Sequence, residues 1–298
     1  MPATKFSCPD GQEIPISGCL EDGCRCGTRC MFLPTLRAVA QSSDRKLDEP
    51  SVTELLTGTR EVFLKKTKDY AINPEDALYA LQGQGIHGIH EKHIDGDILA
   101  EVRLKDGTTS GKFDLYGQLL DEDTGTLGDL KVTSSYKLMR ALGYYKKSVP
   151  TGEFYKTGAK KGQPKYRQEL FTDGVRYVMD WALQLNYYRI LLEQQGFEVK
   201  RMFIQAICRD GSLRIAAERG IDRNVYIIPI NKISDQWLIR YFKHKAKALK
   251  EAIATGEIPK LCSVRERWHD KKCQSYCDVA DYCDHGQAIK QAMIKKAG

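Results

Sequence analysis

The stretch "GKFDLYGQLLDEDTGTLGDLKVTSS", residues 111–135, decides the fold. Its two apolar-rich runs, "KFDLYGQLL" and "TLGDLKVTS", flank the turn-forming segment "DEDTG". The run "ILAEVRL" at 98–104 precedes them across a second turn, "KDGTTSG". Such runs, separated by turns that contain Gly and Asp, are typical of antiparallel strands. The sequence therefore predicts a three-stranded antiparallel meander, followed by a helix at 135–146.

The segments on either side add both helices and strands. Helices are predicted at 34–41, 75–94, 173–195 and 234–255, and strands at 199–209 and 224–230. Ser51 and Glu54 have the spacing of a capping box, so another helix begins at Ser51. The glycines at 83, 85 and 88 indicate close approach by a neighbouring backbone. The helix at 173–195 carries an apolar stripe at three- and four-residue steps: Val175, Val178, Trp181, Leu185, Tyr188 and Leu192.

The composition is that of a folded α/β protein without a membrane anchor. The chain has 298 residues, of which 42% are hydrophobic and 29% charged, enough for one large domain or two modest ones. It contains no apolar run of about 18 residues and no signal peptide, so we expect a cytoplasmic protein with no membrane partner. The net charge of +7 permits a polyanionic partner without requiring one.

Nine of the ten cysteines lie in two clusters at the ends of the chain. Disulfide frameworks are expected in short secreted chains, and this chain is long and carries no export signal. The clusters therefore predict thiolate metal sites, which suit zinc and iron–sulfur clusters alike. The first cluster is Cys8, Cys19, Cys24, Cys26 and Cys30, and the second is Cys262, Cys273, Cys277 and Cys283.

The meander carries residues suited to metal-assisted hydrolysis. Asp129 and Lys131 point to one face of a strand because side chains alternate along it. Asp114 on the neighbouring strand would add a second carboxylate to the same divalent cation, Mg²⁺ or Mn²⁺. Downstream, Gln184 and Tyr188 share one helical face. An Asp-x-Lys triplet alone is more often an exposed ion pair, so the interpretation depends on the surrounding motifs.

The ordered pieces "GQGIHGIHE", "GKFD", "GDLKVTSS" and "WALQLNYYR" resemble the PD-(D/E)XK nuclease superfamily, in its RecB-like branch with the CRISPR-associated exonucleases. The resemblance spans residues 50–285 and implies a restriction-endonuclease-like core, a central mixed sheet flanked by helices. It also implies that His87, Asp114 and Asp129, with the Leu130 carbonyl, bind Mg²⁺ or Mn²⁺. Lys131 would serve the attacking water, and Gln184 and Tyr188 would support Lys131 and the DNA strand. His90 and His93 are rival metal ligands, but the motif spacing favours His87.

Many RecB-like nucleases hold an iron–sulfur cluster with one early cysteine and three late ones, the late ones spaced C-x2-C-x5-C. Here the tail reads Cys273-x3-Cys277-x5-Cys283, and Gly58 stands where the early cysteine is expected. Either Cys262 completes a tail tetrad or Cys30 reaches across. The first alternative is favoured because it leaves the N-terminal cysteines as a second thiolate site. The expected domains are a cysteine-rich metal module at 1–33, the nuclease core at 34–260, and a second cysteine-rich module with a basic tail at 261–298.

Residues 146–167 are predicted as a long loop that binds DNA. Aromatic residues interleave with its basic ones, and cations with aromatic faces suit single-stranded DNA. The basic residues are Lys146, Lys147, Lys156, Lys160, Lys161, Lys165 and Arg167, against the single acid Glu153. A merely solubilising loop is the alternative. We expect a metal-dependent deoxyribonuclease, an exonuclease with a single-strand preference, in DNA repair, recombination or phage or CRISPR-type processing. Its expected partner is DNA, either single-stranded or at duplex ends. The alternative is a non-catalytic, cysteine-rich nucleic-acid-binding protein.

Overall fold

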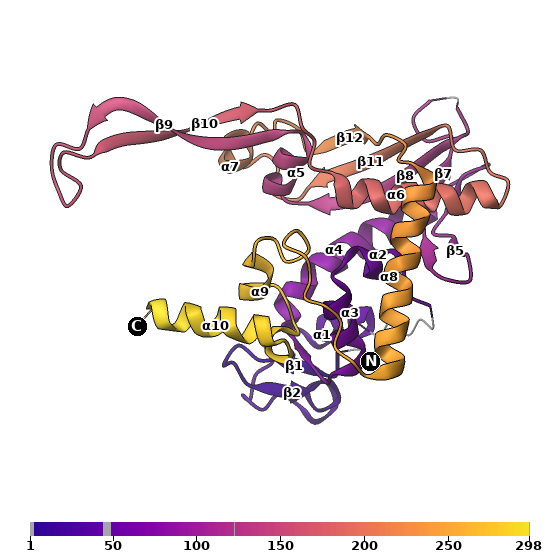
Figure 1. Ribbon diagram of the computed structural model, residues 1–298, viewed down its shortest axis with the longest axis horizontal. Helices are drawn as coiled ribbons and strands as arrows, with labels where there is room; N and C mark the ends of the chain where they lie inside the picture. Colours follow the sequence, from indigo (N-terminus) through magenta and orange to yellow (C-terminus); the bar gives the residue numbers. More distant parts are fainter. Residues whose placement is uncertain (1–2, 44–48, 122, 298) are drawn as a thin grey trace.

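A five-stranded mixed sheet forms the centre of the computed structural model, which describes residues 3–43, 49–121 and 123–297 (Figure 1). The strand order is β12-β11-β8-β7-β4, in which β8 and β11 run parallel and the other pairs are antiparallel. The strands are β4 (Leu99–Ala100), β7 (Leu115–Gly117), β8 (Thr126–Thr133), β11 (Arg201–Cys208) and β12 (Val225–Pro229). The predicted antiparallel meander is confirmed as β4, β7 and β8, with a separate hairpin of β5 (Arg103–Lys105) and β6 (Ser110–Lys112) inserted in it.

Helices pack on this sheet and extend the core away from it. Helix α6 (Met179–Gln194) contacts β8 and β11, α4 (Pro74–His90) contacts β8, and α5 (Ser135–Ala141) contacts β11. Helix α8 (Asp235–Thr255) connects α6 to α3 (Thr59–Thr67) (Figure 1). The protein is therefore an α/β protein with a mixed central sheet flanked by helices. Three short elements complete this part: α2 (Val52–Leu56), η2 (Glu91–His93) and α7 (Arg214–Ala217).

Local signals predicted some helix ends and misplaced others. The capping box is confirmed at α2, where the Glu54 amide donates to Ser51 Oγ at 3.1 Å and the Ser51 amide donates to Glu54 Oε2 at 2.8 Å. Helix α6 begins at Met179 rather than at residue 173. Asp173 and Gly174 form a turn in which the Val175 amide donates to Asp173 Oδ1 at 2.8 Å. Val175 is consequently 52% exposed and does not belong to the apolar face.

The glycines of α4 do not mark a close backbone approach, so that expectation is wrong. Apart from the nearby backbone of α4 itself, a methyl group added at Gly83, Gly85 or Gly88 would have no atom within 4 Å. The tight glycine contacts lie elsewhere. At Gly111 in β6, an added Cβ would stand 2.6 Å from a ring carbon of Tyr188. Glycine is therefore needed where the inserted hairpin meets α6.

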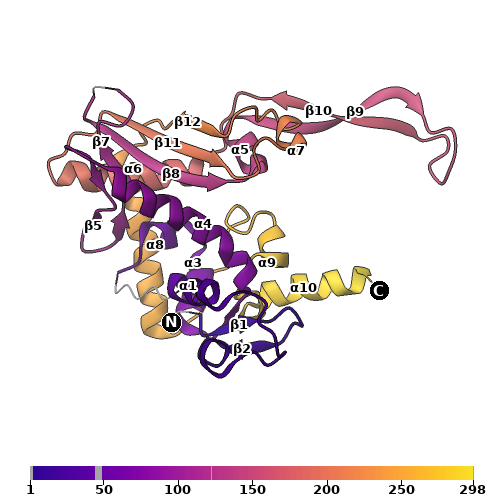
Figure 2. The ribbon, with the colours of Figure 1, turned by 180° about the vertical axis from the view of Figure 1, so that it is seen from behind.

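The predicted loop at 146–167 is wrong, because this segment is a regular two-stranded ribbon. Strands β9 (Tyr144–Phe154) and β10 (Pro164–Thr172) pair antiparallel and project from the body of the protein (Figures 1 and 2). Pro150 and Pro164 misled the prediction. Both strands of a two-stranded ribbon are edge strands, where proline costs no ladder hydrogen bond if its nitrogen faces outward. Residues 144–172 are called the basic ribbon below.

Both ends of the chain pack onto the helices beneath the sheet. Strand β1 (Lys5–Ser7) pairs with β2 (Glu13–Pro15) and with β3 (Ala71–Ile72), and Phe6, Cys19, Leu36 and Val39 form a small apolar core. The segment η1 (Gly18–Asp22) and α1 (Leu33–Ser43) complete this part. The tail consists of α9 (Lys271–Ser275), η3 (Ala280–Tyr282) and α10 (Asp284–Ala297). It is held on α3 by the Lys272–Glu61 pair at 2.6 Å and the Lys65–Asp278 pair at 2.8 Å. Among the described residues, no helix is long and apolar enough to span a membrane.

Candidate active site

Helix α4 brings His87 to the sheet edge. Asn73 caps its N-terminus by accepting the Glu75 amide at 3.0 Å, and the helix then runs along β8 to His87 in its last turn. His87 Nδ1 lies 2.7 Å from Glu101 Oε1 and 3.6 Å from Asp114 Oδ1. Each of these three residues offers a ligand atom within 4.8 Å of the others. His90 and His93, the rival ligands, do not belong to this group.

Glu101 is a site residue that the sequence reasoning missed. It follows β4 with a φ of 54°, a left-handed conformation that is rare for glutamate. Its amide donates to the Asp114 carbonyl at 2.9 Å, which holds the two acidic residues side by side. Burial alone would raise the pKa of Glu101, but hydrogen bonds from Lys112 and His87 bring it below its ordinary value. The only sequence signal was an acidic residue within a short strand-like run.

Asp129 and Lys131 share one face of β8, as the alternation predicts. Lys131 Nζ lies 2.6 Å from Asp129 Oδ2. Asp129 is 1% exposed, and its Oδ1 accepts no hydrogen bond from any described residue. A buried carboxylate oxygen without a partner is costly unless a cation or donor compensates it. This atom is therefore a good place for a metal ion.

Asp114 lies beside Asp129 and is also buried. Its Oδ2 accepts the Leu130 amide at 2.7 Å. Burial and the negative charge of Asp129 raise the pKa of Asp114 to about 7, because two carboxylates in a poorly hydrated site resist ionising together. In an extended strand the amide and carbonyl of one residue point to the same side. The Leu130 carbonyl therefore points to the Asp114 side of β8, past the end of its pairing with β7.

These donors fit a hard divalent cation. Carboxylate and carbonyl oxygens suit Mg²⁺ and Mn²⁺, and a single imidazole is compatible with Mn²⁺. A bound cation would also relieve the repulsion between Asp114 and Asp129 and occupy the free side of Asp129 Oδ1. Of the predicted donors, His87 and Asp114 lie together with Glu101, and the charge of Asp129 acts on Asp114 from beside this group. That all of them bind one ion stays a prediction.

Gln184 and Tyr188 lie on the same side of α6, next to the Asp-x-Lys strand. Gln184 Nε2 donates to the Tyr188 hydroxyl at 3.0 Å. Burial raises the pKa of Tyr188, and the charges of Asp129 and Lys131 also act on its hydroxyl. The expected position of this pair near the lysine is therefore observed. Its role in catalysis stays a prediction.

The four tail cysteines line one cavity of about 30 Å³ at the N-terminus of α3. Cys262 lies against Gly58, the position at which the resemblance to RecB-like nucleases predicts an early cysteine. A methyl group at residue 58 would overlap the Cys262 sulfur. Cys262 therefore occupies the space that a cysteine side chain at residue 58 would need. Burial raises the pKa of Cys277 to about 12, so in the absence of metal its thiol remains protonated.

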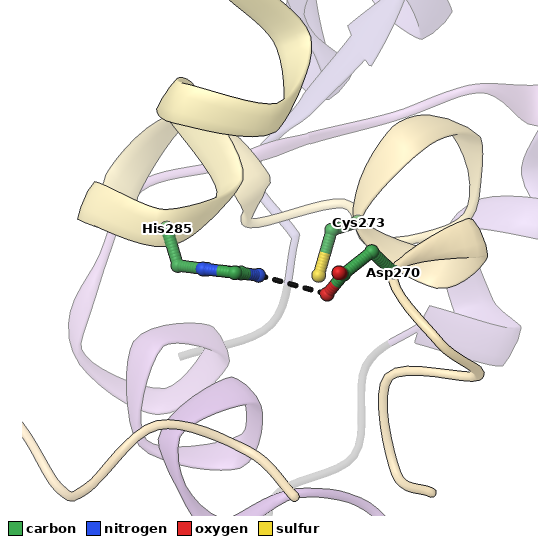
Figure 3. Close-up of side chains that lie close together, drawn as sticks. All are labelled: Asp270, Cys273 and His285. Atoms are coloured by element: carbon green, nitrogen blue, oxygen red, sulfur yellow. Dashed lines mark hydrogen bonds and ion pairs between the residues drawn. The ribbon is translucent and has the colours of Figure 1, made fainter. Parts of the chain in front are cut away.

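Cys273 also belongs to a mixed group that the sequence did not indicate. Cys273, Asp270 and His285 offer ligand atoms within 4.8 Å of one another, and His285 Nε2 lies 2.8 Å from Asp270 Oδ1 (Figure 3). Asp270 is one of three successive residues with positive φ, after Trp268 and His269. Arg267 also contacts Asp270, so part of the negative charge is already compensated. This group is a candidate metal site that contains one cysteine.

The N-terminal cysteines lie around the small core of the first segment. Cys19 is buried, Cys8 and Cys24 are half-buried, and Cys26 and Cys30 are exposed. No three of them lie within 4.8 Å of one another. Their grouping into a second thiolate site stays a prediction.

Comparisons with known proteins return distant structural likenesses alone. No family model matches the sequence, and no curated protein matches it. The crystal structure of SSO0001 is 15% identical, with a TM-score of 0.43 over 85% of this chain and 94% of that one. The crystal structure of an exonuclease candidate from Eubacterium rectale is 14% identical, with a TM-score of 0.27 over 82% of this chain and 80% of that one. Both TM-scores lie below 0.5, so neither likeness says what this protein does.

Proposed function

We propose that the protein is a metal-dependent DNA nuclease that hydrolyses phosphodiester bonds. The observation that carries the proposal is the free, buried Oδ1 of Asp129. Lys131 pairs with the other oxygen of this carboxylate, Asp129 and Asp114 act on each other by charge, and His87 and Glu101 lie beside Asp114. A bound cation would compensate this oxygen and the neighbouring Asp114 carboxylate together, which the ion pair with Lys131 alone does not do.

In this proposal His87, Glu101, Asp114 and Asp129 hold Mg²⁺ or Mn²⁺ together with the Leu130 carbonyl. The ion would lower the pKa of a bound water and polarise the scissile phosphate. Glu101 orients His87 through their 2.7 Å contact, which fixes the position of the imidazole. The Leu130 amide holds Asp114 in place at 2.7 Å.

Lys131 supports the reaction as a positive charge. Burial favours the neutral amine, but the charges of Asp129 and Asp114 outweigh burial and raise the pKa of Lys131 above its ordinary value. The ammonium therefore stays protonated at neutral pH. It can orient water and stabilise charge on the phosphate, but it is poorly suited to removing a proton. Tyr188 and Gln184 back this lysine from α6.

The finer fold assignment, a restriction-endonuclease-like core, belongs to the same proposal. The order β12-β11-β8-β7-β4 puts the Asp-x-Lys strand in the middle of the sheet, where β7 pairs only with its first three residues. Beyond them β8 pairs with β11 alone, and its free side there would give the metal site its opening. We also propose exonuclease action and a division into three domains, a cysteine-rich module at 1–33, the nuclease core at 34–260 and a second cysteine-rich module at 261–298.

The tail tetrad is proposed to hold an iron–sulfur cluster. Tetrahedral zinc with Zn–S bonds of about 2.3 Å places its sulfurs about 3.8 Å apart. No three of the tail sulfurs lie within 4.8 Å of one another, a wider arrangement than one ion needs. Cys262 takes the role of the missing early ligand because it fills the space beside Gly58. The N-terminal cysteines are proposed as a second thiolate site for zinc or iron.

Incubation of end-labelled single- and double-stranded DNA with Mg²⁺, Mn²⁺ or EDTA tests the nuclease. We expect cleavage with either metal and none in EDTA. Asp97→Asn, at an exposed acidic residue in the turn before β4, is the control for Asp129→Asn. DNA binding without cleavage under every condition would favour the non-catalytic nucleic-acid-binding alternative.

A further inference from the structure

The basic ribbon is a two-stranded element that has no core of its own. Strand β9 has eleven residues and β10 has nine, and most of their side chains are exposed on both faces. An isolated two-stranded ribbon is only marginally stable in water. Its exposed faces therefore call for a partner along its length.

The charge of the ribbon identifies that partner as a polyanion. It carries seven basic residues and two acidic ones. Glu153 pairs with Lys165 at 3.0 Å, and Glu169 pairs with Arg167. Lys147, Lys156 and Lys161 form no ion pair with any residue in the described parts of the chain.

The aromatic residues argue against a platform for unstacked bases. Tyr144 packs against the main core, and Tyr145 stacks on Phe171 with ring centres 6.0 Å apart. Tyr155 has Lys160 and Lys165 over its ring at 5.9 and 6.0 Å. Single-strand binding needs successive free rings. Only Phe154 and Tyr166, each 58% exposed, remain open among the aromatics interleaved with the basic residues.

The dimensions of the ribbon match duplex DNA. Eleven residues at about 3.3 Å each span about 36 Å, which equals about one turn, or ten base pairs, of B-form DNA. The major groove is about 12 Å wide and admits a two-stranded ribbon. The ribbon follows β8 along the chain after the short helix α5, which contacts both β9 and β11, the strand next to β8.

We propose that the basic ribbon lies in the major groove of duplex DNA beside the cleaved strand and contacts phosphates over about one helical turn. The position of the ribbon beside the cleaved strand rests on the proposed nuclease function, whereas the binding of duplex DNA by the ribbon does not. The protein would therefore require about ten base pairs of duplex next to its cleavage site.

Fluorescence anisotropy in EDTA tests the proposal without catalysis. The probes are fluorescein-labelled duplexes of 6, 10, 14 and 20 base pairs and a 20-nucleotide single strand. We expect affinity to rise up to about ten base pairs and then to level off. Lys147→Gln, Lys156→Gln and Lys161→Gln combined should reduce the slope of log K against log salt by about two to three, since each lost phosphate contact removes about 0.9. The matched control is Lys243→Gln, Lys247→Gln and Lys250→Gln, three exposed lysines of α8.

The outcomes separate this proposal from the nuclease. Tighter binding of the single strand than of the 20-base-pair duplex would overturn the groove assignment, as would an equal loss of slope in the α8 control. Ribbon-dependent duplex binding by a protein that cleaves nothing with Mg²⁺ or Mn²⁺ would support the ribbon and reject the nuclease. Cleavage that is insensitive to duplex length and to the ribbon variant would reject the ribbon and support the nuclease.

Discussion

The Asp129 carboxylate is the group on which the proposed metal site depends most. Its two oxygens face different demands: Lys131 lies 2.6 Å from Oδ2, and Oδ1 has no hydrogen-bond partner among the described residues. A buried carboxylate that is only partly compensated destabilises the fold, unless a bound ligand compensates the rest of its charge. The neighbouring carboxylate of Asp114 makes a cation the ligand of choice.

Asp129→Asn should abolish the stabilisation of the protein by Mn²⁺ and lower cleavage by at least about 100-fold, the lower end of what one positioned electrostatic group supplies. The amide keeps the shape but offers no charge to a metal. Thermal unfolding with and without Mn²⁺ measures the first effect, and single-turnover cleavage the second. An undiminished Mn²⁺-dependent shift in Tm would exclude Asp129 as a ligand.

Glu101→Gln should weaken Mn²⁺ binding by about 10- to 100-fold, the usual cost of losing a group that orients or assists a metal ligand. The substitution removes the charge that His87 contacts at 2.7 Å and keeps the size of the side chain. Glu91→Gln, on the exposed segment η2, is the matched control. Calorimetric titration with Mn²⁺ decides the matter, and equal affinities in the two variants would contradict the role of Glu101.

Asp114 makes the stability of the metal-free protein depend on pH. Its folded pKa of about 7 lies above the ordinary value of 3.8 because of burial and the Asp129 charge. Its contribution to stability is therefore fully present below about pH 4 and is lost as the pH rises through about 7. In EDTA, Tm should fall between pH 5 and pH 8, and Mn²⁺ should reverse the fall most strongly above pH 7. In Asp114→Asn this component of the pH dependence should disappear; its persistence would assign it to other groups.

At the level of elements, the contact of β6 with α6 positions Tyr188. The absence of a side chain at Gly111 lets the Tyr188 ring approach the backbone. The Val52 side chain also borders the space that a side chain at residue 111 would need. Tyr188 then reaches the Asp-x-Lys strand. One glycine therefore links the inserted hairpin to the site.

Gly111→Ala should destabilise the fold by about 1–3 kcal/mol, because the new methyl group would stand 2.6 Å from the ring and force repacking. Gly83→Ala is the control, since its methyl group meets open space in α4. That variant should gain about 0.5–1 kcal/mol from the lower entropy of its unfolded state. Urea unfolding of both proteins measures the difference. Equal stabilities would mean that Tyr188 does not need the close approach at Gly111.

At the scale of the whole molecule, the tail closes over α3 and places Cys262 beside Gly58, about two hundred residues earlier in the chain. Arg60 joins the same contact, since its Nε donates to the Pro259 carbonyl at 2.8 Å. Because the tail is polar, the burial of its apolar side chains contributes little to its folding. Metal ligation would supply the missing free energy of folding.

Cys262→Gly should lower the iron content of anaerobically purified protein, and Gly58→Cys in the same chain should restore it, because the new thiol would enter the space that Cys262 vacated. Cys277→Ser should lower iron content and Tm together. Cys208→Ser is the control, because Cys208 is buried in β11 away from both clusters. Metal analysis and the visible absorption spectrum report the result. Iron or zinc retained at the wild-type level in Cys262→Gly would assign the fourth ligand to another residue, with Cys30 the first to test.

Features that depend on near neighbours along the chain could be predicted from the amino-acid sequence. Alternation along a strand placed Asp129 and Lys131 on one face, helical spacing paired Gln184 with Tyr188, and the capping box set the start of α2. Backbone periodicity carries the information in the first two cases, and a local hydrogen-bond motif carries it in the third. The meeting of His87 and Asp114 was implied by the resemblance of the ordered motifs to a nuclease superfamily.

Features that depend on contacts distant in sequence could be seen in the folded protein alone. Glu101 joins the site through a left-handed backbone and a bond to Asp114, and neither leaves a local pattern. The basic ribbon contains prolines that indicate a loop, yet its strands pair because edge positions tolerate them. Cys262 fills the space beside Gly58 because folding brings the tail onto α3. Such contacts form only when distant segments pack together, so no single segment of the sequence contains the information that predicts them.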